Sequence, residues 1–463
     1  MTAVSASRRV AVVGGGITGL AAAHALAHSD PAAGGELSTV LFEADQRVGG
    51  KLFTSPFAGH PAIDEGPDAF LARLPWATAL ARAVGLGDDL VAPQAGKAAV
   101  WWDRLHPIPE KLLLGMPTDV LALGRSRLLS WDGKLRAALE PLLPRTSLDT
   151  DSLGAFVRAR FGQQVHERLV DPLVGSIYAA DTDHFSLAAV PQIHDLAGKG
   201  RSVLLAGRRM PAPAADAGPV FFAPRHGMGA LATATAAAAR AAGADLRLDA
   251  AVSNIARDGR GWRVNDEVFD AVVLACPAAA AARLLAGAAA DSARSIGMIP
   301  AADVAMVSLA LHERDWPAAL RGMSGYLVPK PQQRLVTAAS FGSQKWAHWQ
   351  VGDHVIVRVS LGRDGLPVLH LDDEQLIASA VEEVGHHIGL ALQPEHARVS
   401  RWPGAFPQYR PHHAQGVAEI ERALPAGLFL AGASYHGIGV PACIRSAQQA
   451  ASRAAQMLMT VAE

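Results

Sequence analysis

Three glycines near the start of the chain have a spacing typical of phosphate binding. Gly14, Gly16 and Gly19 read G-x-G-x-x-G, between an apolar run at residues 10–13 and an alanine-rich run at 20–27. The first glycine permits a tight turn, the second lets the backbone approach a pyrophosphate, and the third allows close helix–strand packing. The N-terminus of the following helix would add amide donors and partial positive charge. The motif predicts a dinucleotide site formed by Gly14, Gly15, Gly16, Ile17, Thr18 and Gly19.

A carboxylate at the end of the next expected strand supports a dinucleotide site. The alternative is a glycine turn that serves packing alone. Glu43 follows the strand at residues 39–42 and stands 24 positions after Gly19. The usual separation is about 20, and the expected loop at residues 29–36 accounts for the excess. A carboxylate there accepts hydrogen bonds from ribose hydroxyls and repels a 2′-phosphate, which disfavours NADP.

A second glycine pair follows, in the run Arg47-Val48-Gly49-Gly50-Lys51. G-x-G-x-x-G, a strand-end Glu and R-x-G-G together resemble the flavoprotein group that includes amine oxidases, phytoene desaturases and protoporphyrinogen oxidases. In that group the second glycine pair lies against the pyrophosphate and ribityl chain of FAD. The resemblance therefore implies FAD, with contacts from Glu43, Ala44, Arg47, Gly49, Gly50 and Lys51.

Three further segments resemble the protoporphyrinogen/coproporphyrinogen III oxidase family, in order along nearly the whole chain. They are DEGPDAFL at residues 64–71, VDPLVGSIYAADTDHFSL at 170–187 and LAGASYHGIGVPACI at 430–444. The resemblance implies flavin contacts from Gly66, Pro67, Asp68, Ala69, Val252, Trp402, Ile438, Gly439 and Val440. It also implies that Ile177 lies against the substrate macrocycle and that Arg73 faces a propionate. An ordinary core role for Trp402 or Ile177, and a solvated Arg73, are the alternatives.

Two departures from related patterns narrow the expected substrate. Many flavoproteins carry an acidic residue after the glycine of the final strand, whereas Gly432 is followed by Ala433 and Ser434. This is typical of porphyrinogen oxidases and counts against an amine oxidase. Mitochondrial and plastid protoporphyrinogen oxidases have an Arg near the position of Ala98, and its absence favours the bacterial coproporphyrinogen branch. Arg73, Arg160 and Arg168 would then attract substrate carboxylates at longer range.

The resemblance implies an FAD-dependent oxidase of haem biosynthesis. It would oxidise coproporphyrinogen III to coproporphyrin III, with dioxygen as acceptor and hydrogen peroxide as product. The flavin carries the redox chemistry, so we expect no strong catalytic side chain. A protoporphyrinogen IX oxidase, another flavin amine oxidase or desaturase, and a non-catalytic FAD-binding protein are the alternatives.

Composition excludes several other classes. The chain has 463 residues, of which 50% are hydrophobic and 18% charged, so a large core is expected and global disorder is not. A net charge of −1 argues against nucleic acid as the main partner. Cys276 and Cys443 cannot form a disulfide framework or a cysteine-rich zinc site, which fits a reducing, cytoplasmic setting. The adjacent pairs at 386–387 and 412–413 are interpreted as surface histidines, so no metal site is expected.

These motifs require an α/β fold, α+β overall, with a Rossmann-like FAD-binding domain assembled from both termini. We assign residues 1–95, 220–300 and 400–463 to that domain, and 96–110 with 301–399 to a mixed-sheet substrate domain. Residues 111–219 would form a helical insert lining the substrate cavity. Residues 112–143 are expected to be mostly helical, with Trp131, Leu135, Leu139 and Leu142 along one stripe. We interpret this stripe as packing inside the protein, and peripheral membrane contact is the alternative. The oligomeric state is not predicted.

Overall fold

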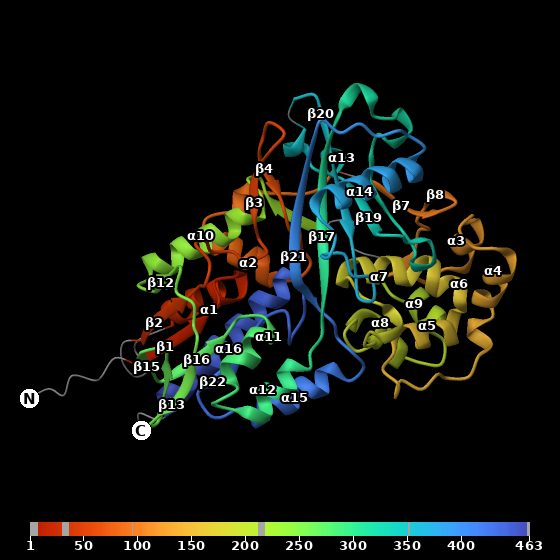
Figure 1. Cartoon of the computed structure of the whole chain (residues 1–463). Coiled ribbons are helices and arrows are strands. Elements are labelled where there is room, and N and C mark those ends of the chain that lie inside the picture. Colours follow the sequence, from red (N-terminus) through yellow and green to blue (C-terminus); the bar gives the residue numbers. More distant parts are fainter. Residues whose placement is uncertain (1–7, 30–36, 95, 212–217, 351, 461–463) are drawn as a thin grey trace, which may run out of the picture.

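The computed structural model describes residues 8–29, 37–94, 96–211, 218–350 and 352–460. Three bodies are visible in Figure 1: an α/β unit on the left, a broad sheet in the centre and a group of helices on the right. Most of the loop expected at residues 29–36 lies outside the described residues. Among the described residues, no helix combines the length and the apolar character needed to cross a bilayer.

A parallel five-stranded sheet forms the core of the α/β unit. Its strand order is β12 (Asp245–Arg247), β2 (Leu37–Phe42), β1 (Arg8–Val13), β16 (Ala271–Leu274) and β22 (Leu428–Leu430). Helices α1 (Ile17–Ala27), α10 (Met228–Ala241) and α16 (Val440–Thr460) share one apolar core with this sheet. The other face packs on the antiparallel strands β13 (Ile255–Asp258), β14 (Gly261–Val264) and β15 (Glu267–Phe269), and on α11 (Ala278–Leu285), α12 (Ala290–Gly297) and α15 (His413–Ala423). The central strands are apolar where both faces are covered, as residues 10–13, 271–274 and 428–430 show.

Small elements extend this unit toward the other two. Strands β3 (Thr54–Phe57) and β4 (His60–Asp64) form a hairpin. Strand β11 (Phe221–Pro224) lies between β5 (Phe70–Leu71) and β6 (Leu90–Val91), next to α2 (Pro75–Ala83). The apolar run at residues 271–290 forms β16 and then α11, with Pro277 as the N-cap of α11.

The central body is a mixed seven-stranded sheet. Its order is β21 (His396–Pro407), β17 (Ala301–His312), β20 (His354–Leu361), β19 (Val336–Phe341), β18 (Met323–Leu327), β7 (Lys97–Trp102) and β8 (Arg104–Pro107). Only β7 and β18 pair in parallel within it. Helix α14 (Asp373–Ile388) packs on this sheet through Leu376, Ala380 and Val384. The short helix α13 (Gly342–Lys345) follows β19 directly.

The third body is helical and has its own apolar core. Its helices are α3 (Val120–Arg125), α4 (Trp131–Ala138), α5 (Leu153–Phe161), α6 (Gln163–Val165), α7 (Asp171–Tyr178), α8 (Pro191–Gly198) and α9 (Val203–Arg208). A π-helical segment, His166–Val170, joins α6 to α7. The 3₁₀ turns Glu140–Leu142 and Thr182–His184 follow α4 and α7.

The helices expected within residues 112–143 begin only at Val120, and the expected packing of the apolar stripe is wrong. The segment opens with the small strand pair β9 (Leu112–Leu113) and β10 (Met116–Pro117), because Leu114 and Gly115, with φ +49° and +88°, form a tight turn before any helix starts. The apolar stripe is also not packed inside the protein: Trp131 is 82% exposed, Leu135 63% and Leu142 74%. Gly133 and Ala137 are buried on the opposite side of α4, so the large apolar side chains point outward.

The expectation that Arg160 attracts carboxylates at long range is also wrong. Its side chain is 1% exposed and forms an ion pair with the fully buried Glu140. Arg160 also donates to the carbonyl oxygens of Pro144 and Arg201, 2.5 and 2.6 Å away. A guanidinium enclosed in this way has a structural partner and does not face substrate.

Candidate functional site

The first glycine turn lies between β1 and α1, at the carboxyl edge of the parallel sheet. Gly14 has φ +107° and donates its amide to the Phe42 carbonyl oxygen at 2.8 Å. A Cβ on Gly19 would lie 1.8 Å from the Gly14 carbonyl oxygen, so the helix can approach the turn only without a side chain there. Gly16 caps α1, and a Cβ on it would meet no heavy atom within 4 Å. The space in front of the helix N-terminus is therefore open.

The second glycine pair packs directly on the first turn. The Gly49 amide donates to the Gly15 carbonyl oxygen at 2.8 Å, and a Cβ on Gly50 would lie 3.3 Å from the Gly16 Cα. Gly49 and Gly50 both have positive φ, at +105° and +55°, which glycine adopts without strain. Two motifs more than 30 positions apart thus form one surface of backbone amides.

Two cations stand beside this surface. The Arg47 guanidinium stacks on the Phe53 ring at 4.0 Å. Burial lowers the pKa of Lys51, and the neighbouring Cys443 opposes that shift. The Lys51 carbonyl oxygen lies 2.2 Å from where a Cβ of Gly66 would be, so the β3–β4 hairpin brings the Lys51 and Gly66 backbones together. An anionic cofactor group at the glycine turns would lie beside these charges.

Glu43 directly follows β2, and its carboxylate contacts the first glycine turn. One carboxylate oxygen accepts from the Gly15 amide at 2.5 Å and the other from the Asp45 amide at 2.9 Å. Its backbone carbonyl accepts from the Ala250 amide at 2.8 Å. Val252 follows in an irregular segment, because residues 249 and 250 bond to the Glu43–Asp45 loop and β13 begins only at Ile255. Val252 therefore lies outside any strand, in a segment that runs beside Glu43.

Asp68 is the most heavily paired carboxylate near the expected flavin position. Lys345 Nζ lies 2.9 and 3.1 Å from its two oxygens, Trp346 Nε1 donates at 3.1 Å, and Arg358 Nη1 is 3.6 Å away. Burial by itself would raise the pKa of Asp68, but the Lys345 and Arg358 charges and these hydrogen bonds hold the pKa far below its usual range. Asp68 is ionised at any working pH. It joins the Gly66–Ala69 segment to the central sheet.

The remaining expected flavin contacts approach Gly66 or precede α16. Trp402 donates its indole N–H to the Glu65 carbonyl oxygen at 3.0 Å, and its ring lies 3.6 Å from where a Cβ of Gly66 would be. Ile438 and Gly439 directly precede α16, and Val440 is its first residue. Cys443 lies one turn later, and burial raises the pKa of its thiol. Residues that are far apart in sequence thus share one region with Gly66–Ala69.

The residues present fit FAD. The glycine turns offer free space and amide donors at a helix N-terminus for a pyrophosphate, as the open position at Gly16 shows. Lys51 and Arg47 would supply positive charge beside it, and the Glu43 carboxylate, next to Gly15, would meet the adenosine ribose. The turn at Gly66–Ala69, Trp402 and the start of α16 would surround the ring system.

Of the two expected substrate contacts, Ile177 lies on the last turn of α7 with 49% of its surface exposed. α7 ends at Ala179, whose φ of +46° is uncommon for a residue with a Cβ. Arg73 is exposed and makes no hydrogen bond or ion pair with any other described residue. The substrate roles of Arg73 and Ile177 stay predictions. Arg168 stacks on the Trp102 ring at 3.9 Å and donates to the Leu128 carbonyl oxygen at 2.9 Å.

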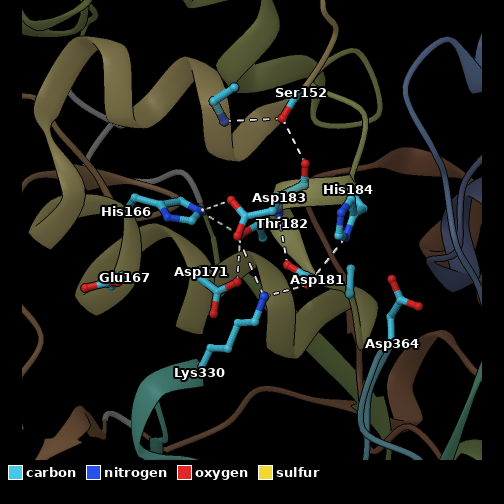
Figure 2. A network of polar contacts seen from close by, with 12 residues as sticks. Ser152, His166, Glu167, Asp171, Asp181, Thr182, Asp183, His184, Lys330 and Asp364 are labelled. Carbon is cyan, nitrogen blue, oxygen red and sulfur yellow. Dashed lines mark hydrogen bonds and ion pairs between the residues drawn. The ribbon is translucent and has the colours of Figure 1, made fainter.

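A directional hydrogen-bond chain leads to Asp171, the first residue of α7, and Figure 2 shows its members His166, Thr182 and Asp171. Arg158 can only donate, so His166 Nδ1, 3.2 Å from its guanidinium, accepts and the imidazole proton is on Nε2. Nε2 lies 2.9 Å from Thr182 Oγ1, which donates to Asp171 Oδ1 at 2.6 Å. Burial lowers the pKa of His166, and the charges of Asp171 and Asp183 oppose that shift. The hydrogen-bond chain therefore requires His166 in its neutral form.

The same segment is joined to the central sheet by ion pairs. Lys330 lies 2.5 Å from Asp181 and 3.7 Å from Asp183, as Figure 2 shows. Arg363 places its two terminal nitrogens 3.1 and 2.9 Å from the two oxygens of Asp171. Residues 171–183 are thus held between the helical body and the sheet.

Sequence reasoning did not single out Lys345, Trp346, Arg358 or Arg363. One signal was available: β20 reads HVIVRVSL, and a cation inside such an apolar strand must find a buried partner. Arg358 is 4% exposed and meets Asp68 and the Gly66 carbonyl oxygen. The interpretation of His387 as a surface residue is wrong. It is buried, contacts the Tyr326 hydroxyl through Nδ1 at 3.0 Å, and burial together with His386 lowers its pKa to about 4.

Comparison with known proteins decides the family. Residues 17–455 match the family described as flavin containing amine oxidoreductase. The chain belongs to this flavin-containing amine oxidoreductase family. Its cofactor is accordingly FAD, and it is an oxidoreductase.

Within the amine oxidoreductase family, full-length relatives carry a more specific name. A protein of Mycobacterium tuberculosis (strain H37Rv) named coproporphyrinogen III oxidase is 34% identical, with 97% of this chain and 98% of the relative covered. A Bacillus subtilis (strain 168) protein of the same name is 31% identical, covering 98% and 99%.

A solved structure from Exiguobacterium sp. 255-15, provisionally named protoporphyrinogen oxidase, gives a TM-score of 0.85 at 29% identity, covering 96% and 98%. A cyclohexylamine oxidase from Brevibacterium oxydans, at 16% identity and TM-score 0.68, shares the fold. The α/β architecture with parallel and mixed sheets is confirmed by these matches.

Proposed function

We propose that this chain is a coproporphyrinogen III oxidase that uses dioxygen and releases hydrogen peroxide. The observation that carries the proposal is the full-length similarity, at 30–34% identity, to several proteins of that name. The segment at residues 170–187, which resembles the substrate segment of porphyrinogen oxidases, supports it by presenting Ile177 at the end of α7.

Bound FAD supplies the two-electron redox chemistry. The protein's own part is to bind and orient the substrate and to hold the ring in place. Asp68, kept ionised by Lys345 and Arg358, anchors the Gly66–Ala69 turn. The ion pair on Asp171 anchors the start of α7, and the one on Asp181 anchors the segment just after Ile177. Ala98 leaves the position of a propionate-binding Arg without charge, which favours an open cavity mouth where extra carboxylates stay in water.

Fluorescence tests this function, because the oxidised macrocycle fluoresces and the porphyrinogen does not. The purified FAD-loaded protein is incubated aerobically with coproporphyrinogen III, and fluorescence and peroxide are followed together. We expect both to rise above a control lacking protein. Fluorescence with protoporphyrinogen IX at an equal or higher kcat/KM would instead favour a protoporphyrinogen oxidase. No turnover of either substrate would refute the proposal.

We also infer peripheral contact with a membrane surface through an apolar ridge on α3, α4 and the turn after them. The ridge consists of Val120, Leu121, Trp131, Leu135, Leu139 and Leu142, all exposed. Arg125 and Arg127 are exposed between α3 and α4. These helices lie at the edge of the molecule farthest from the five-stranded sheet (Figure 1). Apolar side chains with flanking cations are typical of binding to an anionic bilayer surface.

Sedimentation with vesicles tests the ridge. We expect binding to phosphatidylglycerol vesicles, weaker binding to phosphatidylcholine vesicles, and loss of binding in the Trp131→Ser/Leu135→Ser variant. Met298→Ser is the matched control. Met298 is as exposed as Trp131, at 82%, but it directly follows α12 in the α/β unit. Equal sedimentation of the wild type and the ridge variant would overturn the inference.

A further inference from the structure

Gln408 and Tyr409 are adjacent in the chain and buried, at 1% and 4% exposure, directly after β21. Their side chains reach different parts of the site. Gln408 contacts the end of α7, and Tyr409 contacts the loop that leads into α16.

Gln408 holds the turn that follows Ile177. The two protons of its Nε2 are shared among three carbonyl oxygens, those of Tyr178 and Ala179, at 3.1 and 3.3 Å, and that of Phe406 at 3.0 Å. The Asp364 amide also donates to the Ala179 carbonyl oxygen, at 2.8 Å. Ala179 has a positive φ, and such backbone persists only where its surroundings hold it. Gln408 is thus part of what keeps the substrate-facing end of α7 in place.

Tyr409 holds the loop between β22 and α16. Its hydroxyl donates to the Ala433 carbonyl oxygen and accepts from the Gly437 amide at 2.9 Å. The ring lies parallel to His413 at 4.1 Å. This loop ends at Ile438, where the expected flavin contacts begin. Burial raises the pKa of the hydroxyl, so it stays protonated and can donate.

Tyr409 also reaches back to the helical body. Its carbonyl oxygen accepts from the Ser186 amide at 2.7 Å, and its ring stacks on Phe185 at 6.0 Å. Phe185 in turn contacts Tyr178, at 4.8 Å between ring centroids. One continuous set of contacts therefore runs from the end of α7 to the loop before α16.

We propose that Gln408 and Tyr409 are positioning residues that couple the substrate-facing end of α7 to the flavin-facing loop before α16. The substrate side of this inference rests on the proposed function. The coupling itself concerns two backbone segments and does not depend on which porphyrinogen is oxidised. Rigid placement of both segments sets the distance between substrate and flavin ring, on which rate depends steeply.

Two conservative variants separate the two sides in the FAD-loaded protein. Tyr409→Phe keeps the ring and removes both hydroxyl hydrogen bonds, so we expect a roughly five- to thirtyfold faster release of FAD and an altered flavin absorbance spectrum. Gln408→Met keeps the length and removes the amide donor, so we expect KM for coproporphyrinogen to rise roughly fivefold or more while flavin absorbance stays unchanged. Gln408→Asn, one methylene shorter, replaces it if Gln408→Met does not fold.

The controls are matched to each change. Tyr435 lies in the same loop, and within the described structure its buried hydroxyl has no hydrogen-bond partner, so Tyr435→Phe removes a hydroxyl without removing a bond. Gln415 is exposed on α15, and Gln415→Met makes the same chemical change outside the site. We expect both controls to behave as the wild type does.

Hydrogen exchange tests the coupling without any turnover. Each single variant should speed amide exchange in both residues 178–180 and 433–437, and the double variant should change FAD release and KM non-additively. Exchange confined to the segment next to each substitution, together with additive effects, would overturn the coupling. A wild-type protein that oxidises no porphyrinogen would refute the proposed function, and the exchange result would still decide the coupling.

Discussion

Arg363 and Asp171 form a bidentate ion pair across the boundary between the central sheet and the helical body. They stand 192 positions apart, with nitrogen–oxygen distances of 3.1 and 2.9 Å, and their side chains are only 4% and 1% exposed. Arg363 also donates to the Ala180 carbonyl oxygen. The pair thus fastens the start of α7 and the turn after it to the sheet.

Breaking this pair should strongly destabilise the protein. Asp171→Asn leaves a buried guanidinium without its counter-charge, and we expect unfolding in urea to lose about 3–5 kcal/mol. Asp291→Asn breaks the exposed pair with Arg294 and is expected to cost less than about 1 kcal/mol. Similar losses in the two variants would show that the buried pair does not fasten α7.

Gly16→Val tests the cofactor turn. A Val side chain would fill the open space in front of α1 where the pyrophosphate must approach. We expect a colourless protein with a lower Tm, since bound FAD stabilises the folded state. Gly416→Val on α15, whose Cβ also meets nothing within 4 Å, should stay yellow. A fully flavin-loaded Gly16→Val protein would contradict the assignment.

His166 should make stability depend on pH. Burial lowers the pKa of His166 below its ordinary value of 6.5. Below about pH 6.5 the unfolded chain therefore takes up a proton that the folded protein refuses, and stability falls as pH falls. Protonation would also put a proton on Nδ1 facing Arg158. His166→Gln should flatten the dependence of unfolding free energy between pH 8 and pH 5, whereas His370→Gln, at an exposed site, should not. Parallel pH profiles for wild type and His166→Gln would reject this role.

Salt should reduce any preference for coproporphyrinogen over protoporphyrinogen. The first has four propionates and the second two, and exposed cations such as Arg73 attract carboxylates through solvent that salt screens. We expect the ratio of the two kcat/KM values to fall from low to high ionic strength and to be smaller in Arg73→Gln. A ratio that does not change with salt would show that direct contacts, and not screened attraction, discriminate between the two porphyrinogens.

Chelators should leave activity intact. Among the described residues, no three His, Cys, Asp or Glu side chains gather closely enough to hold a metal ion. Incubation with EDTA, dialysis and a repeated fluorescence assay would check this. Activity lost in chelator and restored by one divalent ion would contradict the expectation.

The local geometry of the first glycine turn was predictable from the sequence. The glycine turn depends on residues within six positions of one another and on a strand and helix that flank it directly. Glu43 was predictable for a similar reason, because it ends the next strand of the same βαβ unit. Both predictions rest on backbone geometry that a short segment determines by itself.

Pairings over long separations were decided only by the tertiary structure. Asp68 meets Lys345 and Arg358 at separations near 280 positions, and Arg160 meets Glu140 instead of solvent. Spacing along the chain does not report such contacts, because they form only when distant strands and helices pack. The stripe that contains Trp131 has helical periodicity, and periodicity shows which side chains share a face. Whether that face is covered depends on which other elements reach it, and in this protein none of the described elements covers it.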